Sequence, residues 1–217
     1  MRLHSVQAVQ EYRPKPMSEL AAYLLAIASP YVGSLNLNIG CGEAGIIPLP
    51  GWTNLDRTPG SDTECVCNLD DPGPTLSKIF PYPIMGCVLA SHVLEHITNL
   101  IPLMREIHRV LLPGGYLIAI TPHAGSDDAW EDPTHVRAFT QNSWSYFDRR
   151  FYQGQTGHGA YRSPIDFCFD VVRVDMVLQK RAGIPTEPVF DSALRELAAR
   201  ERNVIGEVIA ILRKVEE

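Results

Sequence analysis

The sequence predicts an α/β protein built on a mostly parallel sheet. Short apolar runs alternate along the chain with segments that have the spacing of a helix. One run, Cys87 to Ala90, is apolar at every position, as is typical of a strand buried on both faces. The length of 217 residues suits a single domain, so we predict one domain over residues 1–217.

Hydrophobic periodicity predicts the elements of the first half. Residues 17–31 have helical spacing, and this helix lies in an N-terminal extension over residues 1–32. Strands are predicted at residues 35–39, 53–56, 64–67 and 87–90. A helix over residues 97–111 follows, and Pro113-Gly114-Gly115 is predicted to end it before a strand at residues 116–121.

The second half opens on a long polar segment. Residues 122–162 are rich in His, Asp, Gly and aromatic residues and are predicted as a loop insertion on the substrate side, partly helical at residues 142–147. A strand over residues 167–178 carries a predicted bulge at Val171-Val172. A helix over residues 191–202 and a strand over residues 204–215 complete the prediction.

Composition excludes several classes of partner. The net charge is −6 and there is no run of Lys or Arg, which argues against nucleic acid. No apolar stretch is long enough to cross a bilayer, and the N-terminus lacks the apolar core of a signal peptide. The five cysteines include no CxxC pair, so we expect a reduced, cytoplasmic protein. Nothing in the sequence indicates an oligomeric state.

A glycine loop after the first strand allows two cofactors. Gly40-Cys41-Gly42-Glu43-Ala44-Gly45, with Asp56 ending the next strand, fits the dinucleotide fingerprint of an NAD(P)-dependent oxidoreductase. That cofactor needs a helix N-terminus for its pyrophosphate, and Pro48 and Pro50 oppose a helix there. S-adenosylmethionine has no pyrophosphate, so the prolines favour it. A glycine turn without any ligand is the third alternative.

Four motifs in order strengthen the choice of S-adenosylmethionine. They are Leu35-Asn36-Leu37-Asn38-Ile39-Gly40-Cys41-Gly42, Asn54-Leu55-Asp56, Ser91-His92-Val93-Leu94-Glu95-His96 and Leu111-Leu112-Pro113-Gly114-Gly115. Over roughly residues 33 to 147 the chain resembles the class I S-adenosylmethionine-dependent methyltransferases, in particular the type 11 group. Asn38 and Asn68 stand where many members carry an acid, and Gly86 stands where an Asp commonly begins the fourth strand.

The resemblance implies a fold and a cofactor site. The fold is a Rossmann-like three-layer sandwich with a seven-stranded sheet of order 3-2-1-4-5-7-6, in which strand 7 is antiparallel. Asp56 would hold the ribose. The remaining implied contacts are to the methionyl part (Asn38, Gly40, Cys41, Gly42), to adenine (Asn68, Leu69) and to the pocket beyond strand 4 (Ser91, His92).

No metal site is predicted. His92-Val93-Leu94-Glu95-His96 fits the inverted zinc-protease motif HxxEH, which requires both histidines on one helix face. His92 is instead expected at the end of a strand, before the helix. Trp130, Phe139, Trp144 and Phe147 are interpreted as packing residues.

The segment Asp132-Pro133-Thr134-His135-Val136-Arg137, common in relatives of this group, is the predicted catalytic segment. Methyl transfer is an in-line displacement that needs alignment, and a base only where the acceptor must lose a proton. We assign His135 as that base, Asp132 as its orienter and Arg137 as an anchor for a small-molecule or sugar-like O or N acceptor. The structural alternative is that Asp132 pairs with Arg137 and pins the loop. A catalytically inactive cofactor-binding domain is the non-enzymatic alternative.

Overall fold

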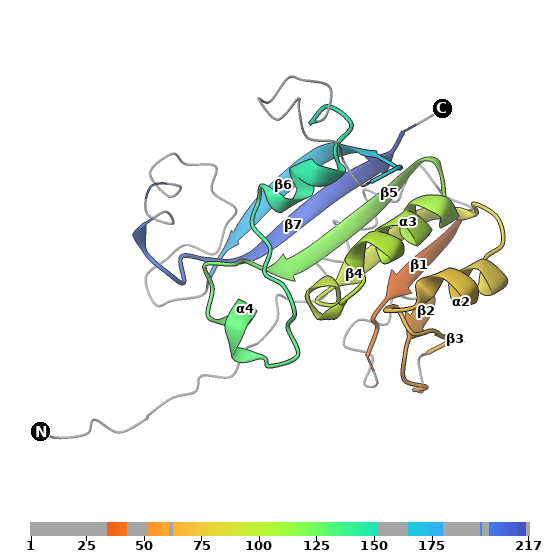
Figure 1. Ribbon diagram of the computed structural model, residues 1–217, viewed down its shortest axis with the longest axis horizontal. Helices are drawn as coiled ribbons and strands as arrows, with labels where there is room; N and C mark the ends of the chain where they lie inside the picture. Colours follow the sequence, from red (N-terminus) through yellow and green to blue (C-terminus); the bar gives the residue numbers. More distant parts are fainter. Residues whose placement is uncertain are drawn as a thin grey trace, which may run out of the picture.

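The computed structural model describes residues 34–42, 52–60, 63–151, 165–179, 196 and 200–215. They form a seven-stranded sheet of order β3-β2-β1-β4-β5-β7-β6, as the resemblance implied (Figure 1). The strands are β1 Leu35–Ile39, β2 Thr53–Asp56, β3 Cys65–Val66, β4 Met85–Ser91, β5 Leu111–Pro122, β6 Phe169–Leu178 and β7 Ile205–Lys214. Strands β1 to β5 pair in parallel, and β7 is antiparallel to both of its neighbours.

Two helices cover one face of the sheet, α2 (Pro72–Ile79) and α3 (Leu100–Val110) (Figure 1). Helix α3 buries an apolar stripe with the i, i+3, i+4 spacing read from the sequence (Leu100, Leu103, Met104, Ile107, Val110). Helix α2 was not predicted from the sequence, because Gly73 and Pro74 oppose a helix. Pro72 is tolerated because the first helical residue has no intrahelical use for its N–H group.

Strand β5 corrects one prediction. Pro113-Gly114-Gly115 was expected to separate α3 from the strand, but β5 begins at Leu111 and includes the three residues. The pairing with β4 shifts across them, from Met85 opposite Leu111 to Cys87 opposite Tyr116. Gly114 has φ +75°, a conformation that glycine accepts without strain, so the three residues form an irregularity within the strand. The bulge predicted in β6 is confirmed, between Val171 and Arg173.

Some predictions fall outside the described residues. They include the helix over residues 17–31, Pro48 and Pro50, so the second helical layer and the extension over residues 1–32 stay predictions. Of the predicted helix over residues 191–202, positions 196 and 200 are helical, whereas positions 201 and 202 form a bend, so the prediction runs two residues too far. The described part of the loop, to residue 151, contains α4 (Asp128–Glu131) and a 3₁₀ helix, η3 (Ser143–Phe147). Among the described helices, none is long and apolar enough to span a bilayer.

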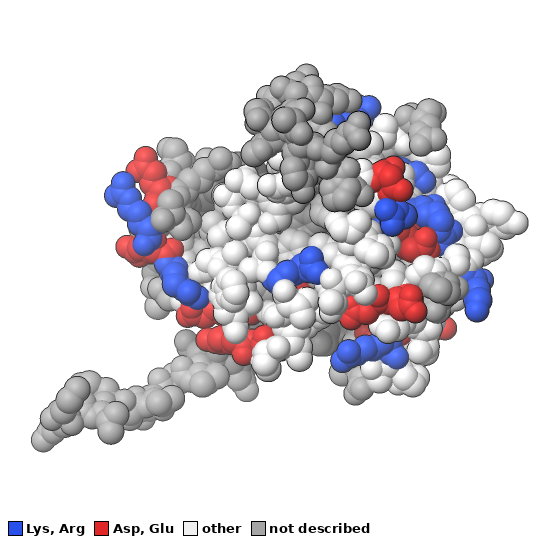
Figure 2. Space-filling view, in the orientation of Figure 1, with Lys and Arg blue, Asp and Glu red and all other residues white. Residues whose placement is uncertain are grey.

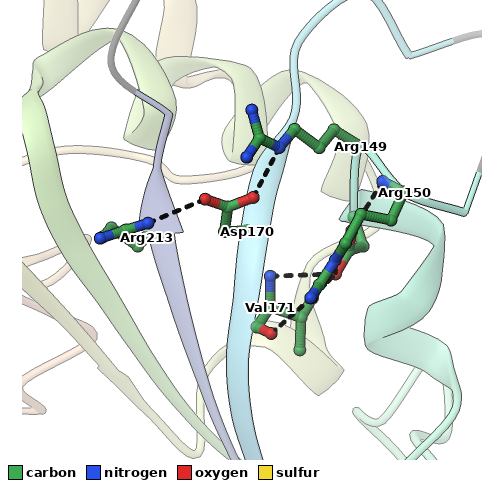
Figure 3. Close-up of polar contacts among 6 residues, drawn as sticks. Arg149, Arg150, Asp170, Val171 and Arg213 are labelled. Carbon is green, nitrogen blue, oxygen red and sulfur yellow. Dashed lines mark hydrogen bonds and ion pairs between the residues drawn. The ribbon is translucent and has the colours of Figure 1, made fainter.

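Charged groups hold the segment after η3 against the edge strand β6 (Figure 3). Arg149 and Arg213 flank Asp170 at 2.7 and 3.0 Å. Asp148 accepts a hydrogen bond from Val171 N at 3.1 Å and pairs with Arg150, which donates to Val171 O at 2.9 Å. The segment thereby occupies backbone groups of β6 that would otherwise be open to pairing with another chain.

These contacts lower the pKa of Asp148. Burial raises that pKa, but the hydrogen bonds from Arg150 and Val171 outweigh burial and hold it below the ordinary 3.8. A carboxyl whose folded pKa is depressed stabilises the fold above its unfolded pKa, and the stabilisation is lost as the pH falls through the folded value.

We therefore expect Asp148→Asn to destabilise the protein by about 1–3 kcal/mol near neutral pH, because the ionised acceptor is lost. The deficit should shrink as the pH falls below the lowered pKa of Asp148. Urea unfolding of both proteins at neutral and acidic pH measures it, with the exposed Asp71→Asn as control. A deficit that is the same at both pH values contradicts the assignment.

Candidate functional site

The glycine loop begins where β1 leaves the sheet. Gly40 and Gly42 have φ of +71° and +75°, in the left-handed region that favours glycine. The N–H groups of Gly40 and Cys41 both donate to Leu55 O, at 2.8 and 3.2 Å. The loop is thus fixed to β2 by its backbone.

Gly40 also packs directly against the segment that follows β4. A Cβ placed on Gly40 would lie 2.5 Å from Cγ2 of Val93, which is closer than real side chains approach. The parallel register explains the contact, because Ile39 lies opposite both Leu55 and Ala90. The carboxyl ends of β1, β2 and β4 therefore meet at one edge, where open α/β sheets bind ligands.

Asp56 closes the loop from the β2 side. Its Oδ2 accepts from Gly42 N and its Oδ1 from Thr58 N, both at 2.9 Å. Each carboxylate oxygen has a second lone pair, so Asp56 can also accept bonds from vicinal hydroxyls. The half-buried carboxylate is held rigidly and suits a ribose diol.

Three of the predicted cofactor residues have buried side chains. Asn38 donates to Asn54 Oδ1 at 3.0 Å, the Cys41 thiol lies 3.7 Å from the Thr63 hydroxyl, and Leu69 lies in the core. Burial raises the pKa of Cys41, so its thiol is not a thiolate nucleophile near neutral pH. The backbone of these residues is what remains for a cofactor contact. Asn68 is exposed and accepts from Asp70 N.

His92 follows β4 and stands between two carboxylates. Ser91 ends the strand half-buried, and His92 has φ 51°, with its N–H on Ile120 O. Its ring lies 3.6 Å from Glu95 and 3.3 Å from Glu207. Burial lowers the pKa of His92, but the attraction of the carboxylates of Glu207 and Glu95 outweighs burial and raises it to about 10. His92 is therefore a cation near neutral pH and a poor base.

His135 has one nitrogen fixed and one available. Its Nδ1 lies 3.2 Å from the carbonyl of Ala129, and a carbonyl only accepts, so Nδ1 carries the proton. That leaves the lone pair on Nε2. Asp132 is not the orienter that the sequence indicated, because its nearest oxygen is 3.9 Å from Nε2 and its other oxygen accepts from Thr134 at 2.6 Å. The hydrogen bonds from Thr134 lower the pKa of Asp132.

Arg137 fastens the loop. Its guanidinium donates to Ile97 O at 2.7 Å and to Thr98 O at 2.8 Å, the residues after a 3₁₀ helix, η2 (Leu94–His96). Burial lowers the pKa of Arg137, although an arginine stays charged. The alternative that Asp132 pairs with Arg137 is wrong, because the guanidinium of Arg137 fastens the loop to backbone carbonyls.

A group that the sequence analysis did not find lies beside His135. One ligand atom each of Glu95, His96 and His135 lies within 4.8 Å of the other two. The motif HxxEH drew attention to His92 and His96, but the ring of His92 faces the two glutamates and is not part of the group. Residues 95 and 135 are 40 positions apart, so no local spacing could have indicated the cluster.

The aromatic residues of the loop divide into two sets. Phe139, Trp144 and Phe147 are buried, as predicted, and Phe139 stacks on Trp144 with ring centroids 5.2 Å apart. Trp130 was wrongly assigned to packing, because its side chain is 61% exposed. Its Nε1 donates to Ala124 O at 2.9 Å, which holds the indole on the surface next to Ala129. An exposed, fixed indole is a surface on which a flat or apolar group can stack.

Charges on the described surface are mixed in sign. On the face shown in Figure 2, Lys and Arg lie among Asp and Glu and do not merge into one broad basic area. This distribution agrees with the net charge of −6 and provides no electrostatic track for a nucleic acid backbone on that face.

Comparison with known proteins agrees with the geometry. Residues 65–119 match a type 11 family model described as a methyltransferase domain. By sequence, no curated protein matches this chain. An S-adenosylmethionine-dependent methyltransferase from Archaeoglobus fulgidus has a similar structure, with a TM-score of 0.60 and 16% identity over 92% of this chain and 95% of that one.

Two further structures have the same fold. One is the 1,6-didemethyltoxoflavin N1-methyltransferase of Burkholderia thailandensis, solved with S-adenosylhomocysteine (TM-score 0.51, 13% identity, 92% of this chain and 78% of that one). The other is the [4+2]-cyclase SpnF (TM-score 0.51, 17% identity, 92% and 82%). The fold is therefore shared by proteins of different chemistry, and the side chains of the site must decide the reaction.

The Gly40–Val93 contact can be tested. Gly40→Ala adds a Cβ both in left-handed backbone and against Val93, so we expect a loss of about 2 kcal/mol or more in the free energy of unfolding. The double variant Gly40→Ala/Val93→Ala should lose less free energy of unfolding than the sum of the two single losses. The smaller side chain at position 93 relieves the clash, while the φ strain at position 40 remains. Denaturant unfolding measures both.

Gly73→Ala is the matched control. An added Cβ there meets nothing within 4 Å, and the residue lies in helix α2. Alanine should be neutral or slightly stabilising at that position. Equal losses for Gly40→Ala and Gly73→Ala would show that the contact is not important.

Proposed function

We propose that this chain is a class I S-adenosylmethionine-dependent methyltransferase, which its fold and the matched segment support. We propose further that it transfers the methyl group to an oxygen or nitrogen of a small-molecule acceptor. The observation that supports this proposal most is that Gly40, Gly42 and Asp56 lie together at the carboxyl edge of the sheet, with Gly42 N donating to Asp56. Two glycines let the backbone approach the methionyl tail, and the carboxylate next to them accepts bonds from the ribose.

The other predicted cofactor residues surround this centre. We place the methionyl tail along the backbone of Asn38, Gly40, Cys41 and Gly42, and the adenine beside the backbone of Asn68 and Leu69. Ser91 and His92 would line the far side, beyond β4. The charge of His92 is already offset by Glu95 and Glu207, so we assign His92 to the wall of the pocket and not to a charge contact with the methionyl carboxylate.

The acceptor side is formed by the loop after β5. Methyl transfer needs little beyond alignment of nucleophile, methyl and sulfur, since the sulfonium is already a good leaving group. His135 supplies the free Nε2 lone pair that can take the proton of an O–H or N–H acceptor. Trp130, on the same loop, offers an exposed apolar surface, which suits a small or sugar-like molecule with a flat face.

Two alternatives have their own support. An NAD(P)-dependent oxidoreductase would use the same glycines and Asp56, and the cyclase SpnF shows that this fold also serves other chemistry. A catalytically inactive cofactor-binding domain would keep the glycine loop and need no His135. We also infer a cytoplasmic location, which fits the five free thiols.

Thermal unfolding with cofactors separates the alternatives. S-adenosylhomocysteine at 100 times its dissociation constant should stabilise the protein by about 2.7 kcal/mol, and NAD should have no effect. Asp56→Asn should weaken S-adenosylhomocysteine binding roughly tenfold or more, because a charged acceptor is lost. Asp71→Asn is the control. Stabilisation by NAD alone would overturn the proposal.

His135 is tested after a screen identifies an acceptor by the S-adenosylhomocysteine released. We expect His135→Ala to lower kcat about 10²- to 10⁴-fold while S-adenosylhomocysteine affinity stays unchanged, since a general base acts on the acceptor alone. His108→Gln, on α3 and packed against Phe167 and Phe169, is the matched histidine control. Full turnover in His135→Ala would remove the base assignment. Cofactor binding without turnover on any acceptor would favour the inactive domain.

A further inference from the structure

The group Glu95, His96 and His135 has chemistry that the proposed function leaves unused. Each contributes one ligand atom within 4.8 Å of the others. Glu95 and His96 come from η2, and His135 comes from the loop after β5. Backbone contacts fix these two segments together, with Val136 N donating to Glu95 O at 2.9 Å and Arg137 donating to Ile97 O. The three side chains are therefore positioned by the fold.

The carboxylate of Glu95 is buried without adequate partners. Its side chain is 2% exposed, and among the described residues neither oxygen has a hydrogen bond. His92 forms an ion pair with it at 3.6 Å, beyond hydrogen-bond length, and shares its charge with Glu207. His92 thus offsets charge but leaves the lone pairs of Glu95 unsatisfied, which is costly in a buried position.

Both histidines present lone pairs as well. The hydroxyl of Thr134 donates to Asp132, so His96 Nδ1, 2.9 Å from that hydroxyl, must be the donor between them. Nδ1 of His135 donates to the carbonyl of Ala129. In each neutral ring the nitrogen left over is Nε2, which can only accept. The two rings meet edge to face, with centroids 4.6 Å apart.

Glu95, His96 and His135 therefore present hydrogen-bond acceptors to one another, and none of the three supplies a donor to the others. We propose that Glu95, His96 and His135 bind a divalent first-row transition cation such as Zn²⁺ through one carboxylate oxygen and two imidazole nitrogens. Two imidazoles and one carboxylate are a donor set that zinc and its neighbours prefer to the oxygen sets of Mg²⁺ and Ca²⁺. The outer contacts also fit, because metal-binding histidines usually donate their second N–H to a carbonyl or, as in the relay His96–Thr134–Asp132, toward a carboxylate.

Three protein ligands leave coordination positions open, on the same edge of the sheet as the glycine loop. A cation on Nε2 of His135 would exclude the base role of that residue in the same molecule. Metal binding requires neither cofactor nor acceptor, so it can be measured independently of the proposed methyl transfer.

The test is calorimetric titration of chelator-treated protein with Zn²⁺, and with Co²⁺, whose visible absorption reports its coordination. We expect one ion per chain, and binding at least tenfold weaker in Glu95→Gln and His96→Gln. His108→Gln, outside the group, should bind as the unmodified protein does. The far-UV circular dichroism and the thermal unfolding midpoint of each variant without any ligand are recorded to show that it is folded.

Thr134→Val provides a second variant, because it keeps every ligand and alters an exposed position. Loss of the contact that orients His96 should weaken Zn²⁺ binding about 10- to 100-fold. Absence of Zn²⁺ and Co²⁺ binding in the unmodified protein would overturn the proposal. Equal affinity in Glu95→Gln, His96→Gln and the unmodified protein would overturn it too.

Discussion

The close approach of Gly40 to Val93 is the constraint on which the site depends. It brings the end of β1 within contact of the segment after β4, so that both stand beside Asp56 at the end of β2. Any side chain at position 40 would push these strand ends apart. The hydrogen bond from Gly42 to Asp56 then adds the third member, and a cofactor meets a surface that is assembled before it binds.

The same edge extends past the cofactor loop to groups contributed by β5 and β7. Because β7 runs antiparallel to β5, its first residues lie beside the last residues of β5, with Glu207 opposite Pro122. That reversal places Glu207 within reach of His92, which follows β4, a strand that does not pair with β7. The charge of His92 is thus a consequence of sheet topology. Its local sequence alone indicates an ordinary histidine.

Features that depend on neighbouring residues could be predicted from the sequence, and features that depend on distant residues could not. The strands, the glycine turn and α3 follow from spacing within a few residues, and all were predicted. Helix α2 was missed because Gly73 and Pro74 oppose helix formation locally, while burial of residues such as Leu76 and contact with α3 favour it. The contacts of Asp132 and Arg137 could not be predicted for a related reason, since their partners are a neighbouring hydroxyl and two backbone carbonyls. Such partners depend on the path of the loop.

Folding stability alone does not favour Glu95 and His135 at this edge of the sheet. A buried carboxylate without hydrogen bonds destabilises the fold, and an apolar residue of similar size would pack without that cost. By contrast, the charges around Asp148 and Asp170 are each paired and hydrogen-bonded, and they protect an edge strand. The charges around β6 are therefore satisfied, whereas the carboxylate of Glu95 at the carboxyl edge has no hydrogen bond among the described residues. That contrast is what is expected of groups kept for a ligand.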